Sequence, residues 1–438
     1  MLDCASAAGW GQSLETTATG RSLPRVQGAQ MERSIDRGEK PRLLVLASTY
    51  PRWAGDHEPG FVHELARRLT DHFEVHVLAP HAPGARAAET LDGVIVKRFR
   101  YAPERLQTLV NDGGIIGNLR HHPWKWMLLP TFFLSQLAAT ARTLHYLRPA
   151  VVHGHWILPQ GLTMALLSFR FPQPFVLTSH GADLYALRGL GWRFLKRWVC
   201  ARMTAITVVS RGMCDAIEAL GVPAEKVSVK PMGVDLDQRF SADARVLRQP
   251  KQLLFVGRLV EKKGLRYLLE ALPRVLEQHP EVTLVIAGFG PEEATLKALS
   301  AKLGIDDRVT FLGAVTQEAL PALYRQAGLF VAPFTAAKSG DQEGLGLVLV
   351  EALGCGCPVL AGDVPAVRDV LPEQGQRVPP ADPVALAEAI TALLSQSAEE
   401  RAERYRPLRL ANRKRFGWQP VSEGYARLLH DARERRPG

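Results

Sequence analysis

Two carboxylates eight residues apart are the clearest chemical signal in the sequence. Glu343 precedes Gly344 and Gly346, and Glu351 lies in an apolar run with no Lys or Arg beside it. A helix that is apolar all round is buried, and a buried carboxylate needs hydrogen-bond donors. Because the neighbouring sequence supplies none, we expect a polar ligand that lies across the start of this helix to supply them. The segment therefore predicts a binding site.

Two cations follow a predicted strand in the same half of the chain. Residues 252–257 are typical of a buried strand, and Arg258 and Lys263 come after it, before Gly264 opens a helix. Open α/β sheets bind ligands at the carboxyl ends of their strands. Arginine and lysine at that edge favour a diphosphate. Taken without the carboxylate segment, the turn could equally be a solvated basic loop.

Glycines at two strand-to-helix turns let the backbone approach a ligand. Gly344 and Gly346 precede the apolar helix, whose N-terminus favours an anion. Gly288 ends the strand predicted at 282–288 and begins a Gly-Phe-Gly-Pro turn. A tight turn followed by proline at a helix start nearly accounts for this second motif without any ligand.

Histidines lie at or just after the carboxyl ends of two predicted strands in the first half of the chain. His180, beside Gly181, follows the strand predicted at 175–178, where it would face the crevice, so we expect it to be functional. His153 and His155 are two residues apart on a strand. A metal site there needs a third ligand in register, and none stands out. Packing or contact with an acceptor is therefore favoured over metal binding.

The first strand-to-helix loop contains Gly55 and Gly60, which suit close approach of an acceptor. Their spacing differs from the dinucleotide pattern G-x-G-x-x-G, which argues against NAD or FAD.

Strand and helix patterns alternate along the chain and position these residues. We expect strands at 42–48, 74–78, 94–98, 150–153, 175–178 and 205–210, with a helix at 61–69. After a polar stretch at 236–249, strands are expected at 252–257, 282–288, 309–313, 329–332 and 358–361, with a helix at 264–277. This alternation predicts doubly wound α/β sheets.

The length of 438 residues indicates two domains. We expect two Rossmann-like domains, at 41–235 and 250–410, that face each other across a cleft, with a helix at 411–438 packing back on the first. Residues 1–40 lack an apolar signal region and are expected to be disordered or an over-extended start, with Met31 as an alternative initiator.

The formal net charge of +10 favours anionic partners. The five cysteines lack zinc-ligand spacing, and a reduced, cytoplasmic compartment fits them. No run of roughly 18 apolar residues predicts a membrane span.

Segments 120–133 and 192–198 mix cations with aromatic residues, which suits an anionic membrane surface or a lipid-linked acceptor. Amphipathic helices with tryptophan in the core are the alternative; no nucleic-acid-binding module matches.

Taken in the order in which they occur, these motifs resemble those of the retaining glycosyltransferases of family 4, which have the GT-B fold. The resemblance extends over residues 42–429. The blocks that carry it are Gly257-Arg258 with Lys263-Gly264, Gly288-Phe-Gly290-Pro291, Arg308-Val-Thr-Phe-Leu-Gly313, and Glu343-Gly-Leu-Gly with Glu351-Ala and Gly356-Cys-Pro-Val359. Departures are Gly362-Asp-Val-Pro where many members have a Gly-Gly-x-x-Glu turn, Phe334 where a serine is frequent, and a first loop without a Gly-Gly pair.

The resemblance implies a nucleotide-diphosphate sugar donor. Arg258 and Lys263 would hold its diphosphate and Glu351 its ribose. Backbone amides at Gly346, Leu347 and Val348 would cradle phosphate.

The resemblance also implies that His180 and Glu343 act on the sugar, with retention of configuration. No metal cofactor is expected. The acceptor would be a glycan or lipid-linked molecule in cell-surface glycan synthesis, on the inner face of the membrane. A cytosolic glucan or disaccharide synthase, a nucleotide-sugar epimerase and a nucleotide-sugar-binding pseudoenzyme are the alternatives.

Overall fold

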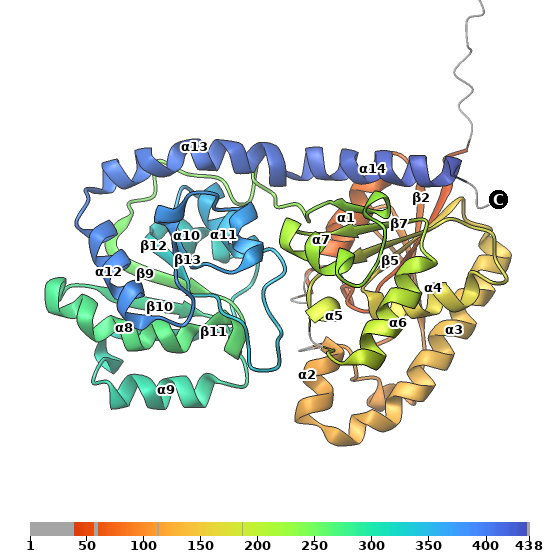
Figure 1. Ribbon diagram of the computed structural model, residues 1–438, viewed down its shortest axis with the longest axis horizontal. Coiled ribbons are helices and arrows are strands. Elements are labelled where there is room, and N and C mark those ends of the chain that lie inside the picture. Colours follow the sequence, from red (N-terminus) through yellow and green to blue (C-terminus); the bar gives the residue numbers. More distant parts are fainter. Residues whose placement is uncertain (1–38, 57–59, 112–113, 186, 436–438) are drawn as a thin grey trace, which may run out of the picture. The chain divides into compact units, whose positions relative to one another are not determined.

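The computed structural model of the protein describes residues 39–56, 60–111, 114–185 and 187–435 (Figure 1). The interpretation of Met31 and of nearly all of 1–40 lies outside these residues.

The described part of the first half forms one sheet in the order β3-β4-β2-β1-β5-β6-β7-β8. Neighbouring strands are parallel except β3, which pairs antiparallel with β4 at the edge. The strands are β1 (Arg42–Leu46), β2 (Glu74–Pro80), β3 (Ala88–Leu91), β4 (Val94–Phe99), β5 (Val151–His155), β6 (Phe175–Ser179), β7 (Ala205–Val208) and β8 (Val227–Val229).

Helices and short helical turns (η) connect these strands. They are α1 (Phe61–Leu69), η1 (Glu104–Leu106), α2 (Gly114–His121), η2 (Pro123–Met127), α3 (Leu128–Leu147), η3 (Ile157–Gly161), α4 (Leu162–Leu167), α5 (Ala182–Tyr185), α6 (Leu190–Ala201), α7 (Arg211–Glu218) and η4 (Ala224–Lys226). In α1, Val62, Leu65, Ala66 and Leu69 are buried at helical spacing, which fixes the face that packs on the sheet.

The second sheet has the order β11-β10-β9-β12-β13-β14, and every pairing is parallel. Its strands are β9 (Gln249–Val256), β10 (Thr283–Ala287), β11 (Val309–Gly313), β12 (Ala327–Ala332), β13 (Val359–Gly362) and β14 (Arg377–Val378). Its helices and turns are η5 (Glu261–Lys263), α8 (Leu265–Gln278), α9 (Glu293–Lys302), η6 (Asp306–Arg308), α10 (Leu320–Gln326), α11 (Leu347–Gly354), η7 (Pro365–Asp369), η8 (Gln374–Gln376) and α12 (Pro383–Leu394).

Two long helices follow. Helix α13 (Ala398–Phe416) packs against α11, and α14 (Trp418–Glu434) packs against α1, β5 and β6 of the first sheet. The last described helix therefore packs on the first sheet.

The predicted fold class, two parallel α/β sheets, is confirmed. Strands β5, β6 and β12 are buried along their whole length, as apolar runs in doubly wound sheets are. Three short strands were not predicted, β3, β8 and β14, because they are brief and mostly half-buried or exposed, so they lack a buried-strand pattern.

Each sheet has a switch point, where the strand order turns from one side of a central strand to the other. Strand β1 lies between β2 and β5, and β9 lies between β10 and β12. At such a switch point the connections leave to opposite faces and open a crevice at the carboxyl ends of the strands. The candidate residues end or follow β1, β5, β6, β9, β10 and β12, so the topology places them at the carboxyl ends of strands at or beside these two crevices.

Among the helices of the described residues, none has the length and apolar character needed to cross a bilayer.

Candidate active site

An ion pair joins the turn after β9 to the loop after β12. Lys263 Nζ lies 2.7 Å from Glu343 Oε2, and each side chain is 14% exposed. Burial opposes ionisation of Glu343, but the charges of Lys263 and Lys262 and the hydrogen bonds to Lys263 and the Gly346 backbone outweigh it, and they lower its pKa to about 2. Glu343 is therefore an anion throughout the physiological range.

The same loop is held at further points. Lys262 Nζ lies 3.1 Å from Asp341 and donates to the carbonyl of Gln342. Gly264 has a φ of +69°, and a Cβ there would lie 1.8 Å from the carbonyl oxygen of Pro333. Only glycine lets the turn after β9 approach the loop after β12 this closely. The contacts of Lys262 and Asp341 were not predicted from the sequence.

Helix α11 presents one half-buried strip. Gly346, with a φ of +81°, caps its N-terminus. Leu347, Val348 and Glu351 are half-buried, while four residues of the opposite face are fully buried: Leu349, Val350, Ala352 and Leu353. The expectation that this helix is buried all round is therefore wrong. The strip includes three of the residues assigned to the donor, together with the helix N-terminus that favours an anion.

Glu351 has a protein partner. The hydroxyl of Tyr324, on α10, donates to Glu351 Oε2 at 3.0 Å, so the premise of a carboxylate without a donor is corrected. Burial raises the pKa of Glu351 to about 7, and the Tyr324 hydrogen bond and the charges of Lys263 and Arg239 only partly oppose it. Sequence reasoning missed Tyr324 because it lies 27 residues away on another helix.

His180 follows β6 and is supported by a second histidine. His155 Nδ1 lies 2.9 Å from His180 Nε2, and the two rings stack with an interplanar angle of 17°. Burial lowers the pKa of His180 to about 3 and that of His155 well below its usual range. Both rings are therefore neutral, and one nitrogen of the pair donates to the other. Phe61 and Trp156 flank His180, each with a ring centroid at 5.0 Å.

A buried carboxylate holds the turn that carries His180. Asp183 accepts hydrogen bonds from the backbone amides of Ile157, His180 and Gly181 at 2.7, 3.2 and 3.1 Å, and from the hydroxyl of Ser179 at 3.0 Å. Its spacing after the Ser-His-Gly motif is the signal from which this role could have been inferred.

The His180 turn meets the Glu343 loop. A Cβ on Gly344 would lie 2.4 Å from the carbonyl oxygen of His180, and one on Gly181 would lie 3.0 Å from Gly344 Cα. The absence of side chains at both glycines therefore brings His180 beside the residue that follows Glu343. The turns that carry the two predicted catalytic residues, on different sheets, therefore touch through their backbones.

The structure places the remaining predicted residues at several positions. Arg258 is exposed, with Nη2 at 3.7 Å from the position of a Cβ on Gly117 of α2. A Cβ on Gly288 would lie 1.9 Å from the carbonyl oxygen of Gly257, so packing between strand ends suffices to explain this glycine. In the first loop, Gly55 has a φ of +78°, and a Cβ there would meet no other described atom within 4 Å.

Gly60 precedes α1, and a Cβ there would likewise meet no other described atom within 4 Å. His155 is 1% exposed and contacts His180. His153 Nε2 pairs with Thr178 Oγ1 at 2.7 Å. No group of three His, Cys, Asp or Glu residues suited to a metal ion occurs among the described residues.

Removal of the Asp183 carboxylate should destabilise the His180 turn. We expect Asp183→Ala to lower the free energy of unfolding by about 3 kcal/mol or more, because four buried donors lose their acceptor. Asp183→Asn retains one oxygen and should lose less. Denaturant unfolding measures both, with the exposed Asp71→Ala as control. Wild-type stability of Asp183→Ala would show that water replaces the carboxylate.

Loss of the Tyr324 hydroxyl should destabilise the protein in a pH-dependent way. The pKa of Glu351 is about 7 in the folded protein against an ordinary 4.5, so its burial destabilises the fold as pH rises through this interval. We expect Tyr324→Phe to cost about 1–3 kcal/mol at pH 8, where the carboxylate needs the donor, and less at pH 5. Tyr267→Phe, whose hydroxyl has no hydrogen bond with the described residues, is the control. An equal cost at both pH values would contradict this account.

Comparison with known proteins identifies the family. Residues 61–238 match the family Glycosyltransferase Family 4, and residues 238–408 match Glycosyl transferases group 1. The phosphatidyl-myo-inositol mannosyltransferase of Mycobacterium leprae (strain TN) is 33% identical over 285 residues, which cover 64% of this chain and 72% of that protein. An amylovoran biosynthesis glycosyltransferase of Erwinia amylovora is 35% identical over 226 residues, 50% of this chain and 55% of that protein.

The fold is also that of a solved structure. Sucrose-phosphate synthase from Thermosynechococcus elongatus superposes with a TM-score of 0.74 at 21% identity, over 90% of this chain and 99% of that one. The protein therefore belongs to glycosyltransferase family 4, within the group 1 glycosyl transferases, and has the GT-B fold.

Proposed function

We propose that this glycosyltransferase moves a sugar, with retention of configuration, from a nucleotide-diphosphate sugar to a lipid-linked or polysaccharide acceptor in cell-surface glycan synthesis. The observation that carries the proposal is the meeting of the His180 turn with Gly344, beside the Lys263 and Glu343 ion pair. This arrangement combines a cation, a helix N-terminus and two carboxylates with a neutral histidine from the other sheet.

The donor would lie along the half-buried strip of α11. The diphosphate would lie at the helix N-terminus near Gly346, with Arg258 and Lys263 as its cations. The ammonium of Lys263 has three donors, so it can bind a phosphate oxygen and keep its bond to Glu343. Glu351, whose side chain shares the strip, would accept hydrogen bonds from the ribose hydroxyls. The N-terminus of α11, Arg258 and Lys263 would stabilise the leaving diphosphate without a bound metal.

The sugar would lie between His180 and Glu343. His180 is neutral at physiological pH, so it can donate a hydrogen bond to a sugar hydroxyl from one nitrogen while its other nitrogen contacts His155. Glu343 is an anion and can accept from sugar hydroxyls or stabilise positive charge that develops at the anomeric carbon.

Two substitutions should separate donor binding from transfer. We expect Lys263→Ala to weaken binding of a nucleoside diphosphate by about 10- to 150-fold, because it removes a charge-assisted contact of about 1.5–3 kcal/mol. Glu343→Ala should leave that affinity unchanged or tighter, since it removes the competing carboxylate, but should lower kcat strongly. Calorimetry with whichever of UDP, GDP or ADP raises the melting temperature measures the affinity.

Lys297→Ala, an exposed lysine paired with Glu293 on α9, is the matched control for charge. Unchanged affinity in Lys263→Ala would remove this lysine from the donor site. Wild-type turnover in Glu343→Ala would refute its part in transfer.

We also propose that the first half contacts an anionic membrane surface. On η2, Trp126 and Met127 are 60% and 79% exposed, and on α6 Leu190 and Phe194 are 87% and 72% exposed. The alternative that these aromatic segments form core does not fit Trp124, Trp126 and Trp192, which are all exposed. Large exposed apolar residues near cations are typical of interfacial helices.

The two lysines of these segments do not contribute to that surface. Lys125 is buried and donates to the carbonyl of Thr108, and Lys196 is buried and donates to that of Leu184. The surface charge comes instead from exposed Arg120 on α2 and from exposed Arg193 and Arg197 on α6.

Membrane contact should depend on the exposed aromatic residues. We expect Trp126→Ser combined with Phe194→Ser to lower co-sedimentation with phosphatidylglycerol vesicles by about tenfold or more, because it removes about 3–6 kcal/mol of apolar burial. Leu247→Ser, which replaces a 90% exposed leucine on another segment, should bind as wild type does. Failure of the wild type to bind these vesicles would remove the membrane from the proposal and leave the transferase assignment intact.

A further inference from the structure

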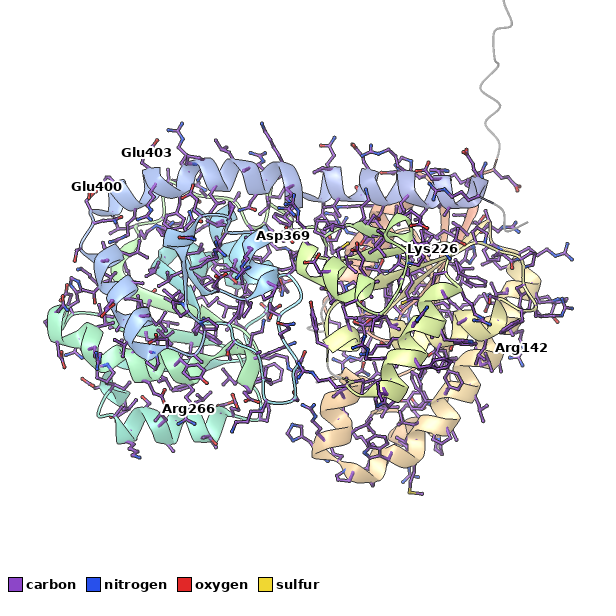
Figure 2. All side chains as sticks on the ribbon, viewed as in Figure 1. Arg142, Lys226, Arg266, Asp369, Glu400 and Glu403 are labelled. Carbon is purple, nitrogen blue, oxygen red and sulfur yellow. The ribbon has the colours of Figure 1, made fainter. Side chains whose placement is uncertain are left out.

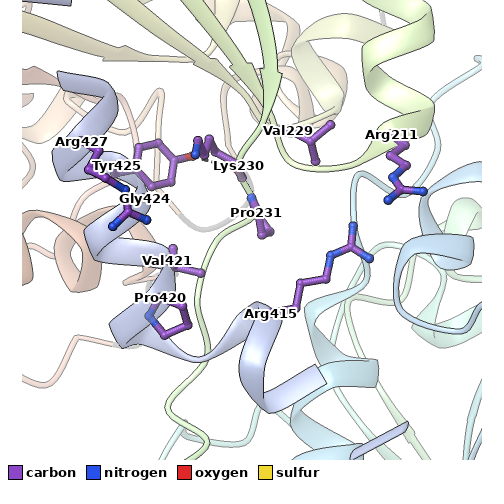
Figure 3. Close-up of a pocket in the computed structure, with 10 residues that line it drawn as sticks. All are labelled: Arg211, Val229, Lys230, Pro231, Arg415, Pro420, Val421, Gly424, Tyr425 and Arg427. Carbon is purple, nitrogen blue, oxygen red and sulfur yellow. Dashed lines mark hydrogen bonds between the residues drawn. The ribbon is translucent and has the colours of Figure 1, made fainter. Parts of the chain in front are cut away.

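A cavity with a volume of about 420 Å³ lies where the chain passes between the two sheets (Figure 3). One wall is the segment after β8, with Lys230 and Pro231, through which the chain leaves the first sheet. The other wall contains Arg415 at the end of α13 and Val421 and Arg427 on α14, where it returns. The volume lies within the range of about 300–1,000 Å³ typical of small-molecule sites.

The lining is strongly basic. Four of its residues are cations, Arg211, Lys230, Arg415 and Arg427, and none of the other described residues that line it is acidic. The remainder of the wall is largely apolar and includes the ring of Tyr425. Figure 3 shows the side chains of Arg211 and Arg415 extending toward each other on one side of the cavity.

Carboxylates nearby balance only part of this charge. Asp369, whose position Figure 2 labels, accepts from the backbone amide of Arg211 at 2.5 Å and from the guanidinium of Arg415 at 2.7 Å. One carboxylate therefore serves two arginines. The nearest carboxylate oxygen to Arg427, on Glu423, is 3.8 Å away. The ammonium of half-buried Lys230 makes no hydrogen bond with the described residues. The cavity therefore keeps a surplus of positive charge.

We infer that this cavity binds a small phosphate ester, whose phosphate contacts Lys230 and the arginines and whose organic part lies on Pro231, Pro420 and Val421. Arginine and lysine donors together suit the several oxygens of a phosphate. None of the residues assigned to the sugar donor lines the cavity, so this is a second site and does not depend on the proposed function.

Occupation of the cavity would favour one contact between the halves. The first turn of α7 packs on η7, where a Cβ on Gly212 would lie 2.6 Å from Cβ of Pro365, and Asp369 of η7 accepts from the amide of Arg211. The guanidinium groups of Arg211 and Arg415 lie 3.7 and 2.7 Å from Asp369 Oδ1, so an anion bound by both arginines reduces the repulsion between them. Bound ligand therefore stabilises the contact between α7 and η7.

Calorimetry with inorganic pyrophosphate as probe, on the full chain, tests the site. Since pyrophosphate can also occupy the proposed donor site, Lys263→Ala and the double variant Lys230→Met, Arg427→Gln are compared. We expect the double variant to weaken the affinity of one binding event by about tenfold or more per removed cation. Lys263→Ala should retain that event. Lys230→Met keeps the apolar stem and the backbone carbonyl to which Tyr425 donates.

Arg433→Gln, an exposed arginine of α14 outside the cavity, is the matched control and should bind as wild type does. Binding that is lost in Lys263→Ala and unchanged in the double variant would overturn the inference. An equal loss in Arg433→Gln would also overturn it, because it would show an effect of net charge only.

Hydrogen exchange provides a second measurement. In the Lys263→Ala background, pyrophosphate should slow exchange of the amides in α7 and η7, and the double variant should abolish this protection. Protection confined to the loop after β12 would contradict the inferred coupling.

Discussion

The ion pair between Lys263 and Glu343 is the interaction on which the geometry of the site depends. It joins the connection that leaves β9 to the one that leaves β12, the two strands at the switch point of the second sheet. Charges in such half-buried positions lose solvation, so the net contribution of the pair is small, but loss of one partner leaves the other uncompensated. The pair therefore matters mainly because it fixes the loop that places Gly344 against His180 and Gly346 at the start of α11.

The first sheet supports His180 by a different physical means. Here burial keeps the histidines neutral, and hydrogen bonds orient them. His155 contacts His180, while His153 pairs with Thr178, which in turn pairs with Thr207 at 2.6 Å. The ring of Tyr425 on α14 lies 5.6 Å from that of His153, so the last helix packs beneath this polar layer. A site with an anion on one sheet and a neutral ring on the other can contact a sugar from both sides.

Two of the places where the halves touch have opposite character. Near His180 and Gly344 the contact is made by backbone atoms, which approach because two glycines lack side chains. Near Asp369 it is made by charges, because one carboxylate accepts from Arg211 and Arg415. The first contact depends on the absence of side chains at the two glycines, and the second depends on the ions around it. A ligand in the basic cavity would act on the second without touching the proposed donor site.

Much of the fold and the chain positions of the site could be predicted from the sequence. The helix expected at 61–69 and the strand expected at 309–313 have those bounds in the structure, because amphipathic and apolar periodicity are local properties. The short strands β3, β8 and β14 escaped prediction because pairing with a neighbour, and not their own pattern, makes them strands. Likewise, the positions of Lys263 and His180 after predicted strands place each residue at the carboxyl edge of its own sheet on sequence alone.

The partners of those residues were decided by tertiary structure. Tyr324 as donor to Glu351, Asp183 as acceptor for the His180 turn, and His155 behind His180 are contacts between distant segments or depend on a local turn geometry. Glu351 lies in an apolar run, which in the sequence indicates a carboxylate that needs a donor outside the run. Only the packing of α10 on α11 shows that a tyrosine supplies one, because hydrogen bonds between helices depend on how their faces meet.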